Sequence, residues 1–340
     1  MIKNILLITD GKPGHENISR GIIETIRKYK DINLIEVNAK LRSSLFKRLI
    51  KNILNKSNIW QGRKLFIDIF YKGCIVPQKI DYDLVISTGG ATSFLNIMLS
   101  KYLNCPNIYC SSLRGLDYTF FTHIISLEDH HYNNVITVDV APLVLDTDPA
   151  KVEVFKRENA IDETENIWSV LVGGPTKDYP FSVDDIEKMI SGIIKLAKKN
   201  KAKLCVTTSR RTTREMEKKL YDIFKLEKSI IKKYVLYNKK PEKVMGMFLA
   251  VADRIFVTEE SGSMITEAIL SKKTVYTIRT NNANPRGIYN MFMDKLMRNK
   301  IVISVEIEDI SLVTLDEAVS CLKQSPAEKV YDKIKYLLED

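Results

Sequence analysis

The sequence has few cysteines, and they form no recognisable pair. The five cysteines in 340 residues are an odd number and contain no C-x-x-C spacing. This argues against a disulfide framework or a zinc knuckle and indicates a reducing compartment. With 45% apolar and 28% charged residues, the chain has a composition that excludes disordered and fibrous proteins. Its 14 glycines and 10 prolines are ordinary numbers, so their positions carry the information.

Long apolar runs are also missing. The longest uncharged stretch, 84–100, is interrupted by Gly89 and Gly90, and it is shorter than the about 20 residues of a transmembrane helix. The first apolar run, 2–10, has the length of a strand and lacks the cleavage site of a signal peptide. We therefore expect a soluble, cytoplasmic protein.

Short β-branched runs alternate with amphipathic stretches, which predicts an α/β fold with parallel sheets and crossover helices. The expected strands are 3–9, 33–37, 84–88, 107–110, 123–126, 135–138, 168–172, 203–207, 233–236, 254–258 and 274–278. The charged stretch 141–166 is the expected linker. We predict two Rossmann-like doubly wound domains, 1–150 and 160–325, whose parallel sheets face an interdomain cleft suited to a ligand. The stretch 326–340 is expected to hold a helix that packs on the first domain.

Unusual turns follow four of the expected strands, where a doubly wound domain binds its ligand. They span 10–17, 87–92, 173–177 and 258–263. Glycine lets the backbone approach a bound group, and the helix that follows offers free N–H groups. Glycine is also frequent in such turns for backbone reasons alone. The turns contain neither a Walker P-loop nor the G-x-G-x-x-G of NAD dehydrogenases, but four of them together favour a ligand.

Charged groups beside these turns have two readings. Arg210 and Arg211 either neutralise a diphosphate, to which guanidinium groups are suited, or are solvated next to a capped helix. Glu267 either is favoured by the dipole of its helix or accepts both hydroxyls of a ribose.

Four motifs carry a resemblance to a known family. They are D-G-K-P-G-H-E-N at 10–17, G-G-P-T-K-D-Y at 173–179, T-S-R-R-T at 208–212 and V-T-E-E-S-G-S-M-I-T-E-A at 257–268. Together they resemble the mitochondrial-fission Elm-type family, whose bacterial members are regarded as glycosyltransferases. More distantly, the first and last motifs are similar to the GT-B enzyme that adds N-acetylglucosamine to the peptidoglycan lipid precursor.

The resemblance implies a GT-B-like fold and a nucleotide-diphosphate sugar as donor substrate. It implies that the second domain binds this donor and that Glu267 holds its ribose. The acceptor is expected to be a lipid-linked or cell-surface glycan. The candidate residues for nucleotide-sugar binding are Gly11, Gly14, Gly173, Gly174, Thr176, Lys177, Ser209, Arg210, Arg211, Glu260, Ser261, Ser263, Met264 and Glu267.

Glycosyl transfer requires stabilisation of the departing diphosphate and a base for the acceptor hydroxyl. We assign the first task to the backbone N–H groups at 173–176 and 261–264, with Arg210 or Arg211. His15 is the preferred base because imidazole titrates near neutral pH, and Asp10 is the alternative. A loop histidine bonded to the backbone is the structural alternative for His15.

No metal or other cofactor is expected. The two D-x-D strings, 81–83 and 146–148, resemble the metal-binding pair of another transferase fold. One leads into a strand and the other lies in the expected linker, so solvated turns are the better interpretation. His130 and His131 are adjacent, and on an extended segment their side chains point in opposite directions. The pair is therefore a poor metal chelate, and a solvated turn is the better interpretation.

The segment 38–67 has eight basic residues and no acid. Leu41, Leu45, Leu49 and Ile53 recur at helical spacing within it. A basic helix with an apolar stripe indicates binding to an anionic membrane surface, unless the stripe faces the core. The candidate membrane-surface residues are Lys40, Arg42, Lys47, Arg48 and Lys51. Nucleic-acid binding is disfavoured because interleaved aromatics are missing.

The predicted function is therefore a glycosyltransferase, peripheral on the inner face of the cell membrane. Two rivals remain open. One is a non-catalytic adaptor that recruits a membrane-remodelling GTPase, and the other is a nucleotide-sugar epimerase on the same fold. The sequence does not specify the sugar, the nucleotide or the acceptor.

Overall fold

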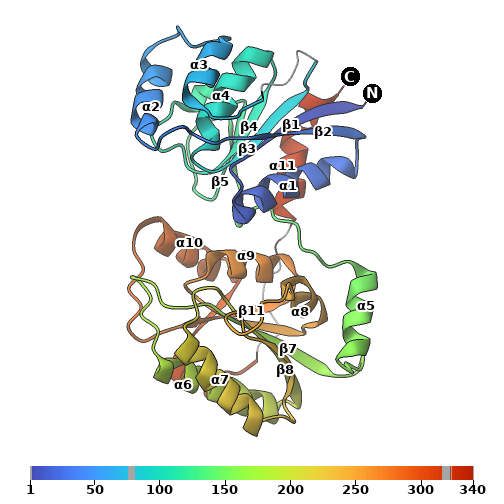
Figure 1. The fold of residues 1–340 in the computed structure, drawn as a ribbon. Coiled ribbons are helices and arrows are strands. Elements are labelled where there is room, and N and C mark those ends of the chain that lie inside the picture. The colour runs from blue at the N-terminus through green and yellow to red at the C-terminus, as the bar shows by residue number, and fades with distance from the viewer. Residues whose placement is uncertain (1, 76–80, 316–321, 323, 340) are drawn as a thin grey trace. The chain divides into compact units, whose positions relative to one another are not determined.

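Alternating strands and helices form two parallel sheets, one in each of two units of the chain (Figure 1). The computed structural model describes residues 2–75, 81–315, 322 and 324–339. The first unit comprises Met1–Val144 and Gln324–Asp340, and the second comprises Leu145–Lys323.

The sheet of the first unit has the strand order β2-β1-β3-β4-β5-β6. Its strands are β1 (Lys3–Thr9), β2 (Ile32–Asn38), β3 (Leu84–Thr88), β4 (Asn107–Cys110), β5 (His123–Ser126) and β6 (Val135–Thr137). Its helices are α1 (Pro13–Arg27), α2 (Phe46–Lys56), α3 (Lys64–Phe70), α4 (Thr92–Leu103) and α11 (Pro326–Ile334), with 3-10 turns η1 (Tyr118–Phe120) and η3 (Lys335–Leu338).

Both faces of this sheet are buried because the side chains of β1 alternate between two cores. Leu6 and Ile8 pack in the cluster formed with α2, α3 and α4. Ile5 and Leu7 pack in the cluster formed with α1 and α11. Helix α11 packs beside α1 in this second cluster. Just beyond the end of α1, the ring of Tyr29 stacks on that of Tyr331 with centroids 4.4 Å apart. This is the doubly wound arrangement expected of a parallel sheet covered on both faces.

The sheet of the second unit has the order β12-β11-β10-β7-β8-β9. Its strands are β7 (Asn166–Val172), β8 (Ala202–Thr208), β9 (Ile231–Val235), β10 (Arg254–Thr258), β11 (Thr274–Arg279) and β12 (Ile303–Glu306). Its helices are α5 (Pro149–Glu158), α6 (Val183–Lys199), α7 (Arg214–Leu226), α8 (Met245–Val251), α9 (Gly262–Leu270) and α10 (Gly287–Arg298), with the 3-10 helix η2 (Ile307–Leu312). Trp168 and Val170 of β7 lie in its main core, packed with α6 and α7.

The predicted α/β fold with two doubly wound sheets is confirmed, and the expected strands are all present. The short strand β12 was missed. The expected linker 141–166 contains helix α5, which starts at Pro149 with the side chain of Asp148 as its cap. The turn predicted over 10–17 is shorter than expected, because helix α1 begins within it at Pro13. The helical spacing expected from Leu41 is wrong at its start, because Leu41 forms an isolated antiparallel bridge with Tyr71 and α2 begins at Phe46.

Candidate functional site

Each sheet has a topological switch point, where neighbouring strands continue into helices on opposite faces. In the first unit it lies between β1 and β3, and in the second between β7 and β10. Ligands of open α/β sheets bind outside the carboxyl ends of the strands at such points. The four turns singled out in the sequence therefore follow the four strands that flank the two switch points.

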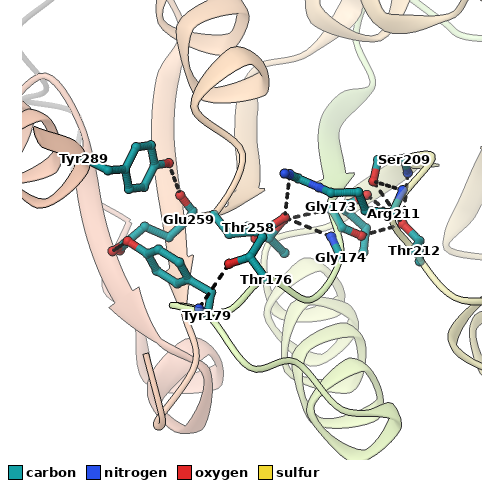
Figure 2. Close-up of polar contacts among 12 residues, drawn as sticks. Gly173, Gly174, Thr176, Tyr179, Ser209, Arg211, Thr212, Thr258, Glu259 and Tyr289 are labelled. Carbon is teal, nitrogen blue, oxygen red and sulfur yellow. Dashed lines mark hydrogen bonds and ion pairs between the residues drawn. The ribbon is translucent and has the colours of Figure 1, made fainter. Parts of the chain in front are cut away.

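In the second unit, hydrogen bonds join the turns after β7, β8 and β10 (Figure 2). The Gly173 N–H donates to Thr258 Oγ1 at 2.8 Å, and the Gly174 N–H donates to Glu260 Oε1 at 2.9 Å. The Thr212 hydroxyl donates to the Gly173 carbonyl. The structure thus brings Gly173, Gly174 and the turn 209–212 together. Protein groups already bind two of the amides expected to stabilise a departing diphosphate, those of Gly173 and Gly174.

The two glycines of this turn are required by close packing. A β-carbon on Gly173 would lie 1.5 Å from Glu260 Oε1, and one on Gly174 would lie 2.2 Å from the Arg211 carbonyl oxygen. Any larger side chain at either position would therefore displace the neighbouring turn. The glycines are explained by contacts within the protein, with no need to invoke a ligand.

The two arginines of the turn after β8 differ in their contacts. Arg211 Nη2 lies 3.5 Å from Glu260 Oε1, with 42% of its side chain exposed against 4% for Glu260. Burial raises the pKa of Glu260 above its ordinary value, and the Gly174 N–H, Thr258 and Arg211 oppose this shift. Arg210 is exposed, and its guanidinium has no bond to any residue the structure describes. Both arginines can therefore turn toward an anion.

The remaining residues of the turn after β7 hold its shape. The Thr176 N–H donates to the Tyr179 carbonyl at 3.0 Å, and the Tyr179 N–H donates to Thr176 Oγ1 at 3.1 Å. Lys177 projects from this tight turn and is exposed. Ser209 supports the next turn, because its N–H donates to Thr212 Oγ1 at 3.0 Å.

The amino terminus of α9 follows the turn after β10. Ser261 precedes the helix but makes no side-chain capping bond. Ser261 and Met264 are buried, whereas Ser263 is exposed. Four residues beyond Ser263, Glu267 lies on the same face of the helix.

Glu267 is the carboxylate of this helix with the most unusual environment. Burial raises its pKa to about 7. Among the described residues its carboxylate has no hydrogen-bond or ion-pair partner. A mostly buried carboxylate without a partner is costly, and hydroxyl donors would lower that cost.

The sequence analysis missed a buried network around Glu259. This fully buried carboxylate accepts hydrogen bonds from the Tyr179 hydroxyl at 2.8 Å and from Arg279 Nε and Nη2 at 2.9 and 2.6 Å. Ser304 donates to its second oxygen at 3.1 Å, and the Tyr289 hydroxyl donates to its backbone carbonyl. The network fixes the turn that leads into α9. Adjacent acids after a strand were a usable signal, because neighbouring side chains point to opposite sides.

At the switch point of the first unit, His15 and Asp10 form a pair. His15 Nδ1 lies 3.0 Å from both carboxylate oxygens of Asp10. The Asp10 side chain is 6% exposed and that of His15 is 32% exposed. A β-carbon on Gly89 would lie 2.2 Å from His15 Nδ1, so the imidazole rests on the turn after β3. This arrangement fixes the orientation of the ring through Nδ1, with Asp10 on one side and the turn after β3 on the other.

Gly11 and Gly14 sit on either side of the start of α1. Gly11 has a φ of 72°, a conformation that favours glycine. Gly14 lies in the first turn of the helix, and nothing lies within 4 Å of the place where its β-carbon would be. The packing of the first unit therefore does not require glycine at 14, and the space is open to a ligand.

Some apolar side chains in and just after the basic segment 38–67 are exposed on the first unit. We call Leu45, Leu49, Leu65 and Ile69 the α2–α3 face, and each is between 46% and 84% exposed. The side of α2 that faces the core carries Ile50 and Leu54, which are buried, whereas Leu45 and Leu49 of the predicted stripe are exposed. The rings of Phe46 and Phe70, beside Leu45 and Ile69, lie 5.5 Å apart.

The basic residues around this face are mostly solvated. Lys40, Lys47 and Arg48 are exposed, and Arg42 donates to the Asp68 carbonyl at 3.1 Å. Lys51 lies on the inner side, where its Nζ is 3.5 Å from the Arg114 carbonyl oxygen. No helix within the described ranges is both long enough and apolar enough to span a membrane.

The D-x-D strings and the histidine pair make ordinary contacts. Asp83 accepts a hydrogen bond from the Asn4 N–H at 2.7 Å, and Asp148 caps α5. His130 stacks on Tyr132. The residues that the structure describes contain no cluster of three or more acids, histidines or cysteines arranged for a metal.

Two doubly wound α/β units, each with polar turns at its switch point, define a protein of the GT-B fold. Residues 13–324 match the family described as Mitochondrial fission ELM1, so the chain belongs to this family. The resemblance stated from the motifs is thereby confirmed. No protein of curated function matches the sequence significantly.

Solved structures share the fold at low identity. A UDP-GlcNAc 2-epimerase from Methanocaldococcus jannaschii is 15% identical with a TM-score of 0.60, over 99% of this chain and 100% of that one. A UDP-GlcNAc 2-epimerase from Neisseria meningitidis bound to UDP-GlcNAc is 12% identical with a TM-score of 0.50, over 100% of both chains. The ADP-heptose lps heptosyltransferase II of E. coli is 12% identical with a TM-score of 0.49, over 98% of both chains.

Proposed function

We propose that the protein is a glycosyltransferase that moves a sugar from a nucleotide-diphosphate sugar to a lipid-linked or cell-surface glycan at the membrane surface. The observation that carries the proposal is the convergence of three turns at the switch point of the second unit. Arg210, Arg211 and the amino terminus of α9 offer positive potential to a diphosphate at this point. The two epimerases that share the fold have UDP-GlcNAc in their names, which supports a nucleotide sugar as substrate.

In this proposal the donor lies across the second unit. The diphosphate binds near Gly174, Arg210, Arg211 and the first amides of α9, and the ribose hydroxyls donate to Glu267. As the glycosidic bond to the diphosphate breaks, negative charge grows on the departing oxygen. The two arginines and the amino terminus of α9 stabilise this charge and so lower the barrier.

His15 is the proposed base for the acceptor hydroxyl. Asp10 accepts the Nδ1–H, which leaves Nε2 as the proton acceptor. We expect His15→Ala to lower transfer at least a hundredfold, because general-base catalysis contributes about that much. Asp10→Asn should lower kcat less and leave donor binding unchanged. Turnover of His15→Ala close to that of the wild type would remove His15 from the mechanism.

The α2–α3 face supports the proposed membrane contact. Its exposed leucines and Ile69 supply apolar area, and Lys47 and Arg48 supply positive charge beside it. Each basic residue near an anionic leaflet contributes about 1 kcal/mol. A few such residues are enough for reversible binding next to a lipid-linked acceptor.

The first test is a thermal-shift series of nucleoside diphosphates and their sugars, followed by radiolabelled transfer to lipid acceptors. Ligand at a hundred times its Kd stabilises the protein by about 2.7 kcal/mol. Transfer should be unchanged by EDTA, since we propose no metal. If no nucleotide shifts the melting temperature, the proposal fails and a non-catalytic adaptor becomes the better explanation.

A nucleotide-sugar epimerase is the second candidate, favoured by the names of the two solved structures at TM-scores of 0.60 and 0.50. An epimerase would convert UDP-GlcNAc in the absence of any acceptor. Proton exchange with deuterated water at the sugar, measured by NMR without acceptor, separates the two activities. The glycosyltransferase proposal expects no such exchange.

A further inference from the structure

The best-defined anion position in the second unit is already occupied by a side chain. Three donors converge on one oxygen of Glu260. The Gly174 N–H lies at 2.9 Å, the Thr258 hydroxyl at 3.2 Å and Arg211 Nη2 at 3.5 Å from Oε1. An amide, a hydroxyl and a guanidinium around one anionic oxygen are also the donors that proteins use for a phosphate oxygen.

The fit of this carboxylate against the backbone is tight. Oε1 lies where the first side-chain atom of residue 173 would begin, 1.5 Å from an added β-carbon. The Glu260 side chain is only 4% exposed, whereas the Arg211 side chain is 42% exposed. Glu260 therefore fills the space left by the missing side chain of Gly173. Its ion-pair partner Arg211 is the more exposed of the two.

A diphosphate and this carboxylate cannot share the same donors, because both are anions and both need the same space. We propose that Glu260 is an intramolecular occupant of the diphosphate subsite, which a bound nucleotide must displace. Glu260 thereby sets the affinity of the site. This rests on the proposed function and reverses the expectation from the sequence, in which Glu260 binds the nucleotide sugar directly.

The proposed occupancy has a quantitative signature. If only a fraction of molecules has the subsite free, the apparent Kd of every ligand that uses it is raised by the same factor. Ligands with further contacts, such as a ribose at Glu267, still bind. Ligands that offer phosphate alone lack these further contacts, so the same factor leaves them with weaker binding than nucleotides.

The test compares the wild type with Glu260→Ala, Glu260→Gln and the control Glu306→Gln by calorimetry. Glu306 is exposed at the end of β12, where its charged neighbours include Arg279 and Glu259, so its substitution removes the same charge without removing a donor or acceptor of the subsite. The ligands are UDP, ADP, inorganic pyrophosphate and uridine. Glu260→Gln retains an acceptor for the Gly174 N–H, and melting temperatures check that each variant is folded.

We expect Glu260→Ala to lower the Kd of both nucleotides and of pyrophosphate by one common factor, on the order of tenfold. Glu260→Gln should give a smaller gain, and uridine and Glu306→Gln should show none. Weaker or unchanged nucleotide binding by folded Glu260→Ala overturns the inference. If no variant binds nucleotides but pyrophosphate still gains in Glu260→Ala, the proposed function fails and the occupancy of the subsite stands.

Discussion

Three glutamates at the carboxyl edge of the second sheet show how neighbours set the role of one residue type. Glu259 is fully buried and accepts hydrogen bonds from three side chains, so it is part of the framework. Glu260 is buried against donors that also suit a phosphate. Glu267 is mostly buried without a partner. Only Glu260 and Glu267 have an environment that a ligand would change, Glu260 by losing its donors and Glu267 by gaining them.

We predict that Glu267 makes the stability of the protein depend on pH. Its pKa is about 7 in the folded protein, above the ordinary value of 4.5. A raised carboxyl pKa means that folding favours the protonated form. The contribution of Glu267 to stability is therefore full below about pH 4.5 and is lost as the pH rises toward 7 and the buried group ionises, by up to about 3 kcal/mol.

Glu267→Gln should remove this loss. Its melting temperature is expected to exceed that of the wild type at pH 8 and to equal it at pH 4.5, as measured by calorimetry. The variant should also discriminate less between UDP and 2′-deoxy-UDP, because Gln accepts fewer hydrogen bonds from ribose. A wild-type melting temperature that is flat between pH 5 and 8 would show that the carboxylate is solvated.

At the scale of elements, the strands could be predicted from the sequence and the helix starts could not. Parallel strands buried on both faces are continuous apolar runs, as in β3, so they stand out from their surroundings. Helix α1 starts at Pro13 without a capping side chain, and its apolar pattern begins only at Ile18. Short β12 is half-exposed and was missed for lack of such a run.

The candidate site was predictable as a set of turns, because strand ends and glycines are visible in sequence. Its internal contacts were not. Arg279 bonds to Glu259 across 20 residues, and Tyr179 does so across 80. Such pairings depend on strand order, which sequence periodicity does not specify. The same holds for the contact of Glu260 with Gly174, on which its proposed role depends.

The first turn of α1 offers a test of whether Gly14 serves a ligand. In a helix, glycine is less favourable than alanine by about 1 kcal/mol, and nothing lies near its missing β-carbon. Gly14→Ala should therefore raise the free energy of unfolding by up to about 1 kcal/mol, measured by urea denaturation. We expect transfer activity to fall at the same time. A stabilised variant with full activity would show that no ligand approaches this backbone.

The α2–α3 face provides the second prediction at this scale. Replacing Leu45 and Leu49 with glutamate removes apolar area and adds negative charge, so binding to anionic vesicles should fall more than tenfold in co-sedimentation. The matched control is Leu226→Glu, an exposed leucine at the end of α7. Binding that is lost in the control as well, or retained in the double variant, contradicts a specific membrane face.

At the scale of the whole molecule, the two units carry different chemistry on similar sheets. The second unit has the turns with Arg211 and Glu260, and the first has the His15–Asp10 pair and the α2–α3 face. The formal net charge of +10 suits partners that are anionic, among them nucleotides and anionic lipids. A donor that binds only the second unit leaves the first free for the acceptor.

This division predicts a local pattern of hydrogen exchange. A saturating nucleoside diphosphate should slow amide exchange in the turns 173–176, 209–212 and 259–264, because opening of these turns becomes coupled to ligand release. Exchange in the turn 10–17 and in α2 should change less, since the proposed donor contacts lie in the second unit. Mass spectrometry of peptic peptides measures both regions in one experiment, with uridine as the ligand that lacks phosphate. Protection confined to the first unit would place the nucleotide at the wrong sheet for the proposed transfer, and His15 would then face the donor in place of the acceptor.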